Sequence, residues 1–328
     1  MRVAFLAIGI LLPLGAEAQH ARKDHRVALI FTTAPVSEMA APNPTHPNPR
    51  ALLRALNALG HVHGQNLTYL PRSAEGQFER LADILRELIS LKVDVIVASD
   101  DVTARRAREV APTVPTVVIF LGDPVESGLI ASLAQPGGNI TGLTRTTGPE
   151  IEGKRMQLLK EAFPNLRRVS FLGRDQEWKS PSGQSTQATA QTLGVTLLHA
   201  KHSPSDYSEA FSGIARDQPD ALFVAESTPN FAHRKLIADF AMKNRLPGMY
   251  SSKEFVNAGG LMSYGADLPD LYHRIAVYVD KILKGAKPGT LPVERPAKFE
   301  FVINLRTARA IGFSIPTPVL MRADQVIE

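Results

Sequence analysis

Hydroxyl, carboxyl and aromatic side chains follow several apolar runs of this sequence, at positions where they can bind a small molecule. A hydroxyl can donate a hydrogen bond to a carboxylate, a carboxylate can bind an ammonium group, and an aromatic ring can cover an apolar group. Asp100 and Glu226 are the candidates for an ammonium group, and Tyr250 and Phe255 are candidates for a pocket wall. The full set of candidate ligand-binding residues is Thr32, Thr33, Ser99, Asp100, Asp123, Glu226, Ser227, Tyr250 and Phe255.

Some of these carboxyl and hydroxyl groups also fit a structural role at the first turn of a helix. Asp123 opens the sequence Asp-Pro-Val-Glu, which has the spacing of an N-cap, a first-turn proline and a capping-box glutamate. Asp101 and Thr228 stand at cap positions too, and this leaves Asp100 as the carboxylate that is freer to bind a ligand. Helix capping and ligand contact therefore stay open as two interpretations of Asp123 and Thr228.

The residues needed for several kinds of catalytic or metal site are missing from the sequence. The chain has no cysteine, which excludes disulfides, thiol nucleophiles and cysteine-ligated metals. His61 and His63 lie beside glycines at a helix end with no third ligand nearby in the sequence, so we expect no metal site. The glycine-rich segment 136–142 lacks the ending of a phosphate-binding loop, and no Gly-x-Ser-x-Gly motif occurs. We expect neither a cofactor nor enzymatic activity.

Apolar strands alternate with amphipathic helices in the first part of the chain. Phe78 and three leucines recur at helical spacing in the segment 77–91 and form one apolar face. Runs such as 26–31 and 93–98 are largely apolar, which indicates strands of a parallel sheet that is covered on both faces. The expected order is strand 26–31, helix 49–59, strand 67–70, helix 77–91, strand 93–98, helix 101–111 and strand 116–120.

The same alternation restarts near residue 147 and predicts a second α/β unit, after a turn-rich segment at 134–143. Late strands at 261–264 and 299–303, with a helix at 268–283, are too few for a third domain. We interpret them as the chain returning to the two lobes and forming a hinge that permits closure. The lobes are predicted as 26–143 plus 261–290 for the N-terminal lobe and 147–258 plus 298–328 for the C-terminal lobe.

The predicted fold class is therefore α/β, with two doubly wound parallel-sheet lobes joined by a multi-strand hinge. Ligands of open parallel sheets bind beyond the carboxyl ends of the strands. In a two-lobed protein these ends face each other across a cleft. The candidate residues follow expected strands, so we expect the ligand in that cleft.

The first 18 residues have the pattern of a signal peptide. A basic Arg2 precedes the apolar segment 3–14, and small residues at Gly15, Ala16 and Ala18 fit a signal-peptidase site before Gln19. The apolar run is too short for a permanent membrane span. We expect the mature protein in the periplasm, without a lipid anchor because the cleavage site has no cysteine.

The length of the chain indicates its number of domains, and its charge distribution indicates which partners to expect. The chain has 328 residues, enough for two domains of ordinary size. Its 37 lysines and arginines are interspersed with 32 acidic residues, and aromatic residues make up only 6%. A nucleic-acid surface concentrates basic and aromatic residues. We expect no nucleic-acid partner, and we expect a monomer.

Several segments together resemble the family of periplasmic substrate-binding proteins of ABC transporters, of the type I clamp architecture, whose relatives include binders of aromatic amino acids. One segment departs from that family, because residues 40–49 are rich in proline where relatives begin a plain helix. This loop is expected to border the cleft. The segments that carry the resemblance are 64–67, 74–81, 122–125, 136–142, 254–265, 282–288 and 298–300.

The resemblance implies the solute-binding component of an ABC importer, which closes two lobes on a small ligand and delivers it to a membrane permease. The expected ligand is small and polar, amino-acid-like or a carboxylate, with or without an aromatic group. Two alternatives stay open: a periplasmic sensor subunit that docks on a membrane receptor, and an exported α/β enzyme. Replacing Thr33 or Asp100 by alanine is expected to weaken ligand binding and to leave folding intact.

Overall fold

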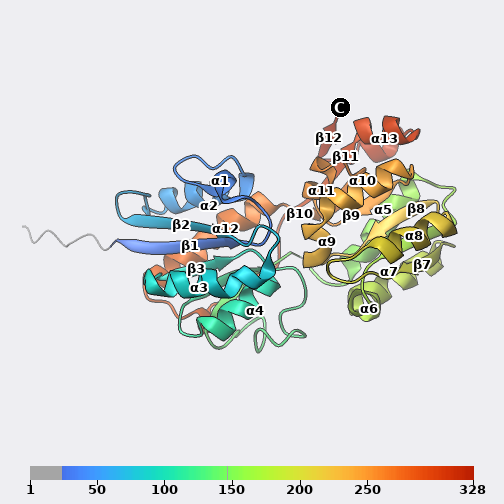
Figure 1. Ribbon diagram of the computed structural model, residues 1–328. Helices are drawn as coiled ribbons and strands as arrows, with labels where there is room; N and C mark the ends of the chain where they lie inside the picture. The colour runs from blue at the N-terminus through green and yellow to red at the C-terminus, as the bar shows by residue number, and fades with distance from the viewer. Residues whose placement is uncertain (1–23, 146) are drawn as a thin grey trace, which may run out of the picture.

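The chain folds into two α/β lobes that lie side by side (Figure 1). The computed structural model describes residues 24–145 and 147–328. The expected signal peptide, residues 1–18, lies outside the described residues. Within the described part of the chain, no helix combines the length and apolar character that a membrane span requires.

The first lobe is built on a five-stranded sheet in which every pair of neighbours is parallel. Its apolar strands are buried on both faces, as the expected parallel sheet requires. The turn-rich segment at 134–143 ends in a fifth strand that the sequence analysis did not predict. In spatial order the strands are β2 (Leu67–Ser73), β1 (His25–Phe31), β3 (Val95–Ala98), β4 (Thr116–Phe120) and β5 (Ile140–Thr144).

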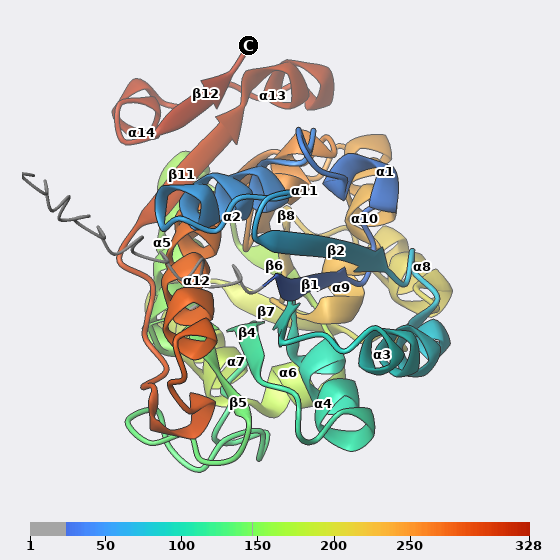
Figure 2. The same cartoon turned by 90° about the vertical axis from the view of Figure 1, so that its left-hand side faces the viewer.

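Helices cover both faces of this sheet, because successive side chains of β1 point to opposite sides. Leu29 packs with helices α2 and α12, whereas Ile30 packs with α3 and α4. Figure 2 shows the neighbouring helices α2 and α12 above and to the left of β1, with α3 and α4 below it. The helical elements of this lobe are α1 (Val36–Met39), α2 (Pro47–Ala58), η1 (Phe78–Arg80), α3 (Leu81–Ser90), α4 (Asp101–Val110), α12 (Leu268–Leu283) and η2 (Pro288–Thr290).

The second lobe contains a seven-stranded sheet that is parallel except where β10 and β11 pair antiparallel. Phe171 of β6 faces the core formed with α5, α7 and α13, and the adjacent Leu172 faces the core formed with α8, α10 and α11. In spatial order the strands are β12 (Gln325–Ile327), β11 (Phe299–Asn304), β10 (Met262–Ala266), β9 (Gly248–Tyr250), β8 (Ala221–Val224), β6 (Arg168–Leu172) and β7 (Thr196–Ala200).

The helices of the second lobe match the expected strand–helix alternation after residue 147. They are α5 (Glu150–Ala162), α6 (Asp175–Lys179), α7 (Pro181–Thr192), α8 (Ser208–Asp217), α9 (Thr228–Ala232), α10 (Arg234–Lys243), α11 (Lys253–Asn257), α13 (Leu305–Ile311) and α14 (Thr317–Leu320).

The tail of the chain divides between the lobes differently from the prediction for 261–290. Strand β10 pairs with β9 and β11, and its Met262 is buried in the core of the second lobe. The helical elements that follow, α12 and η2, pack on the first lobe. The assignment of 261–266 to the N-terminal lobe is therefore corrected. An apolar run identifies a strand, but the sheet that the strand joins depends on long-range hydrogen bonds that a local pattern does not encode.

Gly142 on β5 is a position where only glycine fits. Its φ is +151°, and a Cβ atom there would lie 1.9 Å from the carbonyl oxygen of Val118 on β4. We expect Gly142→Ala to lower the free energy of unfolding by roughly 2–3 kcal/mol, because the neighbouring backbone must move. Urea denaturation measures this loss.

The matched control for that experiment is Gly213→Ala in helix α8. Its added methyl group would meet nothing closer than 3.8 Å, at the Arg216 side chain. A helical glycine replaced by alanine typically gains about 0.5–1 kcal/mol. Equal effects of the two substitutions would contradict the packing described at Gly142.

Candidate ligand-binding site

Two adjoining cavities lie where the carboxyl ends of the two parallel sheets face each other. The larger has a volume of about 630 Å³ and the smaller about 50 Å³. Both are lined by residues of both lobes, and Leu121 and Thr228 line the two of them. They therefore form neighbouring parts of one cleft, at the edge where ligands of open parallel sheets bind.

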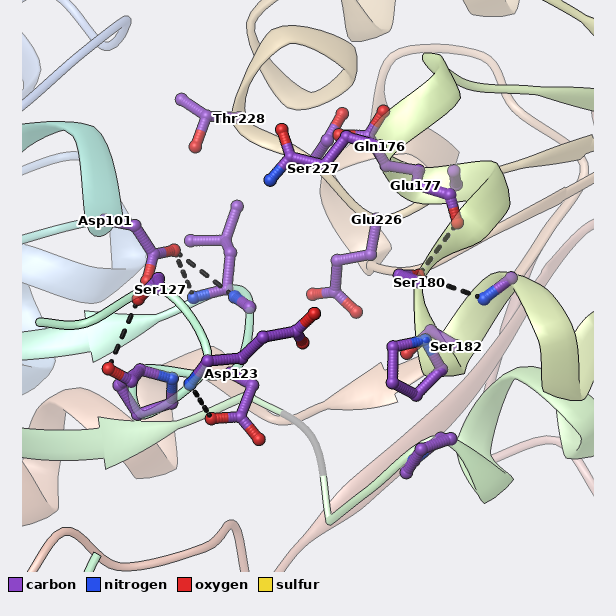
Figure 3. A pocket seen from close by; sticks show the side chains of 18 of the residues that line it. Asp101, Asp123, Ser127, Gln176, Glu177, Ser180, Ser182, Glu226, Ser227 and Thr228 are labelled. Carbon is purple, nitrogen blue, oxygen red and sulfur yellow. Dashed lines mark hydrogen bonds between the residues drawn. The ribbon is translucent and has the colours of Figure 1, made fainter. Parts of the chain in front are cut away.

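Acidic and hydroxyl side chains gather around the larger cavity. Figure 3 shows Asp101 and Asp123 on the side of the first lobe, and Ser180 and Ser182 on the side of the second, with Glu226 between them. The six carboxyl side chains that line this cavity are Asp101, Asp123, Glu126, Glu152, Glu177 and Glu226.

Seven of the nine candidate residues line the cleft. Asp123, Glu226 and Ser227 line the larger cavity. The other four, which follow strands of the first lobe, line the smaller cavity: Thr32, Thr33, Ser99 and Asp100. The two groups were expected to share one binding site, and the structure divides them between two adjoining spaces.

Tyr250 and Phe255 line neither cavity. Both are almost fully buried, and their rings stack at 4.9 Å with an interplanar angle of 17°. They lie in the apolar core on one face of the second sheet. Strand β9 ends at Tyr250, but its side chain points into the core, which a position in the sequence does not reveal.

Asp100 and Asp101 have exchanged the roles expected from the sequence. Asp100 caps helix α4 by accepting a hydrogen bond from the Thr103 backbone N–H (2.8 Å), and it also accepts from the hydroxyls of Thr32 (2.9 Å) and Ser99 (3.0 Å). The expectation that Asp101 is the cap is wrong. Asp100 is instead the carboxylate with the larger number of local donors.

Asp101 reaches across to the loop after β4. Its Oδ2 accepts hydrogen bonds from the backbone N–H groups of Leu121 (2.8 Å) and Gly122 (3.3 Å). Its buried Oδ1 has no hydrogen-bond partner among the described residues. Burial of the carboxyl group raises the pKa of Asp101 to about 6, and the neighbouring Asp100 adds to this effect.

Two further polar residues at the cleft stabilise turns and helix ends. Asp123 accepts hydrogen bonds from the backbone N–H groups of Val125 (2.8 Å) and Glu126 (3.0 Å), as an N-cap would, but a turn and not a helix follows it. Ser227, rather than the expected Thr228, caps helix α9 by accepting from the Asn230 N–H (3.3 Å). Thr228 is thus left as a first-turn residue that lines both cavities.

A buried network of two arginines and two glutamates lies in the wall of the cleft. Arg155 on α5 donates to Glu152 and, over 3.0 Å, to Glu226. It also donates to the Tyr264 carbonyl oxygen (2.7 Å) on β10. Arg145 Nε lies 3.2 Å from Glu226 Oε1, an ion pair without hydrogen-bond alignment. The network thereby joins the end of β5 to the second lobe.

The two glutamates of this network differ in whether both of their carboxyl oxygens have a partner among the described residues. Glu226 forms ion pairs with both Arg145 and Arg155. Glu152 accepts from Arg155 through Oε1, and its Oε2 finds no donor in the described part of the chain. Burial raises the pKa of Glu152 to about 7, against the opposing effect of Arg155.

Oppositely charged side chains with an unpaired atom line the smaller cavity. Nη2 of Arg145 has no hydrogen-bond partner in residues 24–145 and 147–328, and the arginine is only 4% exposed. Oδ1 of Asn48 and Oε2 of Glu254 are likewise unpaired within those ranges. A buried polar group without a partner is costly, so such groups commonly mark a place that a ligand or water occupies.

Histidine and aromatic side chains complete the wall of the smaller cavity. Nδ1 of His46 accepts from the Asn48 backbone N–H (3.2 Å), which leaves Nε2 as the donor of the neutral ring. Burial lowers the pKa of His46 and so favours that neutral form. The guanidinium groups of Arg145 and Arg234 both lie over the ring of Phe231, at 5.5 Å and 5.0 Å from its centre.

The sequence analysis missed the charged groups of the smaller cavity. Arg145 directly follows β5, so recognition of that strand would have identified it. His46 and Asn48 belong to the proline-rich segment 40–49, which was expected to border the cleft. Glu254 lies in one of the segments that carried the family resemblance.

Known proteins are similar to this chain over most of its length. The family model described as ABC transporter substrate binding protein matches residues 48–327. A tyrosine-binding protein of Clostridioides difficile is 23% identical over 274 residues, which cover 80% of this chain and 75% of that protein.

Solved structures agree with the two-lobed fold. A conserved domain protein from Vibrio cholerae superposes with a TM-score of 0.79 at 26% identity, covering 93% of this chain and all of that chain. An ABC domain from Streptococcus pneumoniae in complex with L-Trp superposes with a TM-score of 0.75 at 22% identity, covering 92% and 100%.

Proposed function

The chain belongs to the ABC transporter substrate binding protein family, and from this premise we propose that it captures an amino acid between its two lobes and delivers it to an importer. The ligand favours the closed arrangement of the lobes because it bridges their walls. The partner is the membrane permease of the importer, which binds the closed form. We propose a binding role without catalysis.

The observation that supports this proposal is that an arginine and a glutamate both line the smaller cavity, each with an atom that has no partner among the described residues. The free Nη2 of Arg145 suits the carboxylate of an amino acid, and Oε2 of Glu254 with Oδ1 of Asn48 suits its ammonium group. A water-sized group needs about 10–15 Å³, so the smaller cavity of about 50 Å³ has room for about four such groups. That matches the head group of an amino acid.

Relatives support an amino acid as the ligand. One related protein is named as tyrosine-binding, and a structure of the same fold contains L-Trp. Aromatic and apolar residues also line the smaller cavity, among them Phe31, Phe231 and Tyr272. These side chains can cover the carbon atoms around the head group.

The route of the chain between lobes supports closure. It leaves the first lobe after β5, returns to it at α12 and rejoins the second sheet at β11. Multiple connections of this kind guide a rigid-body motion better than a single tether. We propose that the mature protein is a monomer in the periplasm, released by cleavage between Ala18 and Gln19.

Thermal unfolding with a panel of L-amino acids tests the proposal. A ligand that binds only the folded protein stabilises it by about 2.7 kcal/mol at a hundredfold excess over Kd. We expect at least one L-amino acid to raise Tm by several degrees, and its D-enantiomer to raise Tm less. If no amino acid shifts Tm at millimolar concentration, the proposed ligand class is wrong.

A further inference from the structure

The larger cavity has acids in its walls and arginines at its rim. Three arginines line it, but Arg105 and Arg295 are exposed and Arg174 is paired with Glu177. Exposed charges are screened by water and interact weakly with a ligand. The charges that a ligand meets at depth in this cavity are therefore negative.

The carboxyl group of Glu152 has a hydrogen-bond donor for one of its two oxygens, among the described residues. It is 5% exposed and lines the larger cavity, yet only its Oε1 has a donor. Arg155 donates to Oε1 and not to Oε2, and its other nitrogens donate to Glu226 and to the carbonyl oxygens of Tyr264 and Ser251. The second oxygen of Glu152 remains without a donor among the residues that the structure describes.

Asp101, on the wall formed by the first lobe, also has one carboxyl oxygen with donors and one without, among the described residues. Its Oδ2 is held by two backbone N–H groups, and its buried Oδ1 has no donor within the described ranges. A desolvated carboxylate oxygen without a donor destabilises the folded protein. Two such oxygens on opposite walls of one cavity indicate a ligand that brings hydrogen-bond donors and positive charge.

We infer that the larger cavity takes a cationic group, an amine or a guanidinium, at the far end of an amino acid whose head group lies in the smaller cavity. Glu152 and Asp101 accept hydrogen bonds from this group. The inference rests on the proposed function, and it names basic amino acids as the substrate class. Leu121 and Thr228 line both cavities, which therefore adjoin, and we place a single ligand across the two.

The ionisation of the two carboxyl groups supports this pairing. Burial raises the pKa of Glu152 to about 7 and that of Asp101 to about 6, which shows that the protein compensates their charges only in part. Arg155 and Glu226 are the charged groups that face Glu152, and Asp100 is the one that faces Asp101. A bound cation would favour the ionised forms. Affinity for a basic ligand should therefore rise between pH 5.5 and pH 8.

Calorimetric titration with matched ligands tests the inference on the unmodified protein. L-arginine is compared with its neutral isostere L-citrulline, and L-lysine with L-norleucine, at pH 8. We expect at least one cationic member to bind at least tenfold more tightly than its neutral counterpart. We expect this ratio to shrink at pH 5.5, where the carboxyl groups are largely protonated.

Glu152→Gln identifies the residue responsible. Glutamine keeps an oxygen that can accept from Arg155 and removes the charge. We expect the preference for the cationic ligand to fall about tenfold, while binding of the neutral isostere changes less than threefold. Glu161→Gln is the control, because Glu161 lies on the same helix and pairs with Arg322 at the surface. It should leave the preference unchanged.

Failure of the inference and failure of the proposed function give different results. If neutral or aromatic amino acids bind and neither cationic ligand exceeds its isostere, the larger cavity does not take a cation. The same conclusion follows if Glu152→Gln folds and retains the full preference. If no amino acid binds at all, the proposed function itself is overturned.

Discussion

Replacing Arg155 by methionine is expected to lower the free energy of unfolding by about 3–5 kcal/mol, the usual cost of leaving a buried charge without its partner. Arg155 is 1% exposed and donates to Glu152, to Glu226 and to backbone carbonyl oxygens. Methionine fills a similar volume but donates no hydrogen bond. Among the described residues, Glu152 would lose its one donor and Glu226 would keep Arg145 alone. Urea denaturation at pH 7 measures the loss.

Arg322→Met provides the matched control for the buried arginine. Arg322 pairs with Glu161, and both side chains are more than 40% exposed. Exposed ion pairs contribute about 0–1 kcal/mol, so we expect a change within that range. A loss below about 1 kcal/mol for Arg155→Met would show that the buried network is not essential to folding.

Replacing Arg145 by methionine is expected to weaken amino-acid binding by at least about thirtyfold, since removing a buried charged partner costs about 2–5 kcal/mol. Arg145 lines the smaller cavity, where we place the ligand carboxylate, and its Nη2 has no partner in the described part of the chain. Glu226 keeps its hydrogen bond from Arg155, so folding should suffer less than in Arg155→Met. Titration with the tightest ligand of the panel gives the change in Kd.

The same Arg322→Met variant serves as the control for binding, because it removes an arginine that lines neither cavity. Its Kd should equal that of the unmodified protein. Wild-type affinity in a folded Arg145→Met variant would mean that the head group of the ligand lies outside the smaller cavity.

The structure also changes what is expected of Asp100→Ala. From the sequence, this substitution should weaken binding and leave folding intact. Asp100 accepts three hydrogen bonds, one of which caps α4. Loss of such a cap alone typically costs about 1 kcal/mol of stability. Arg145 is therefore a cleaner probe of binding than Asp100.

Much of the architecture could be predicted from the sequence because it follows from local patterns. Apolar runs such as 26–31 and helical faces such as 77–91 identify strands and helices directly. Their alternation, restarting near residue 147, predicts two parallel-sheet lobes. The polar residues that follow the strands then predict the cleft edge, because parallel strands end at a common side.

Only the tertiary structure decided which of those polar residues are free to bind a ligand. Asp100 is held by three local donors, whereas one nitrogen of Arg145 and one oxygen of Glu152 have no partner among the residues that the structure describes. Likewise, only long-range pairing places β10 in the second sheet. Secondary structure depends on the periodicity of near neighbours. The availability of a side chain depends on groups tens of residues away, as when Arg155 on α5 meets Glu226 and Tyr264.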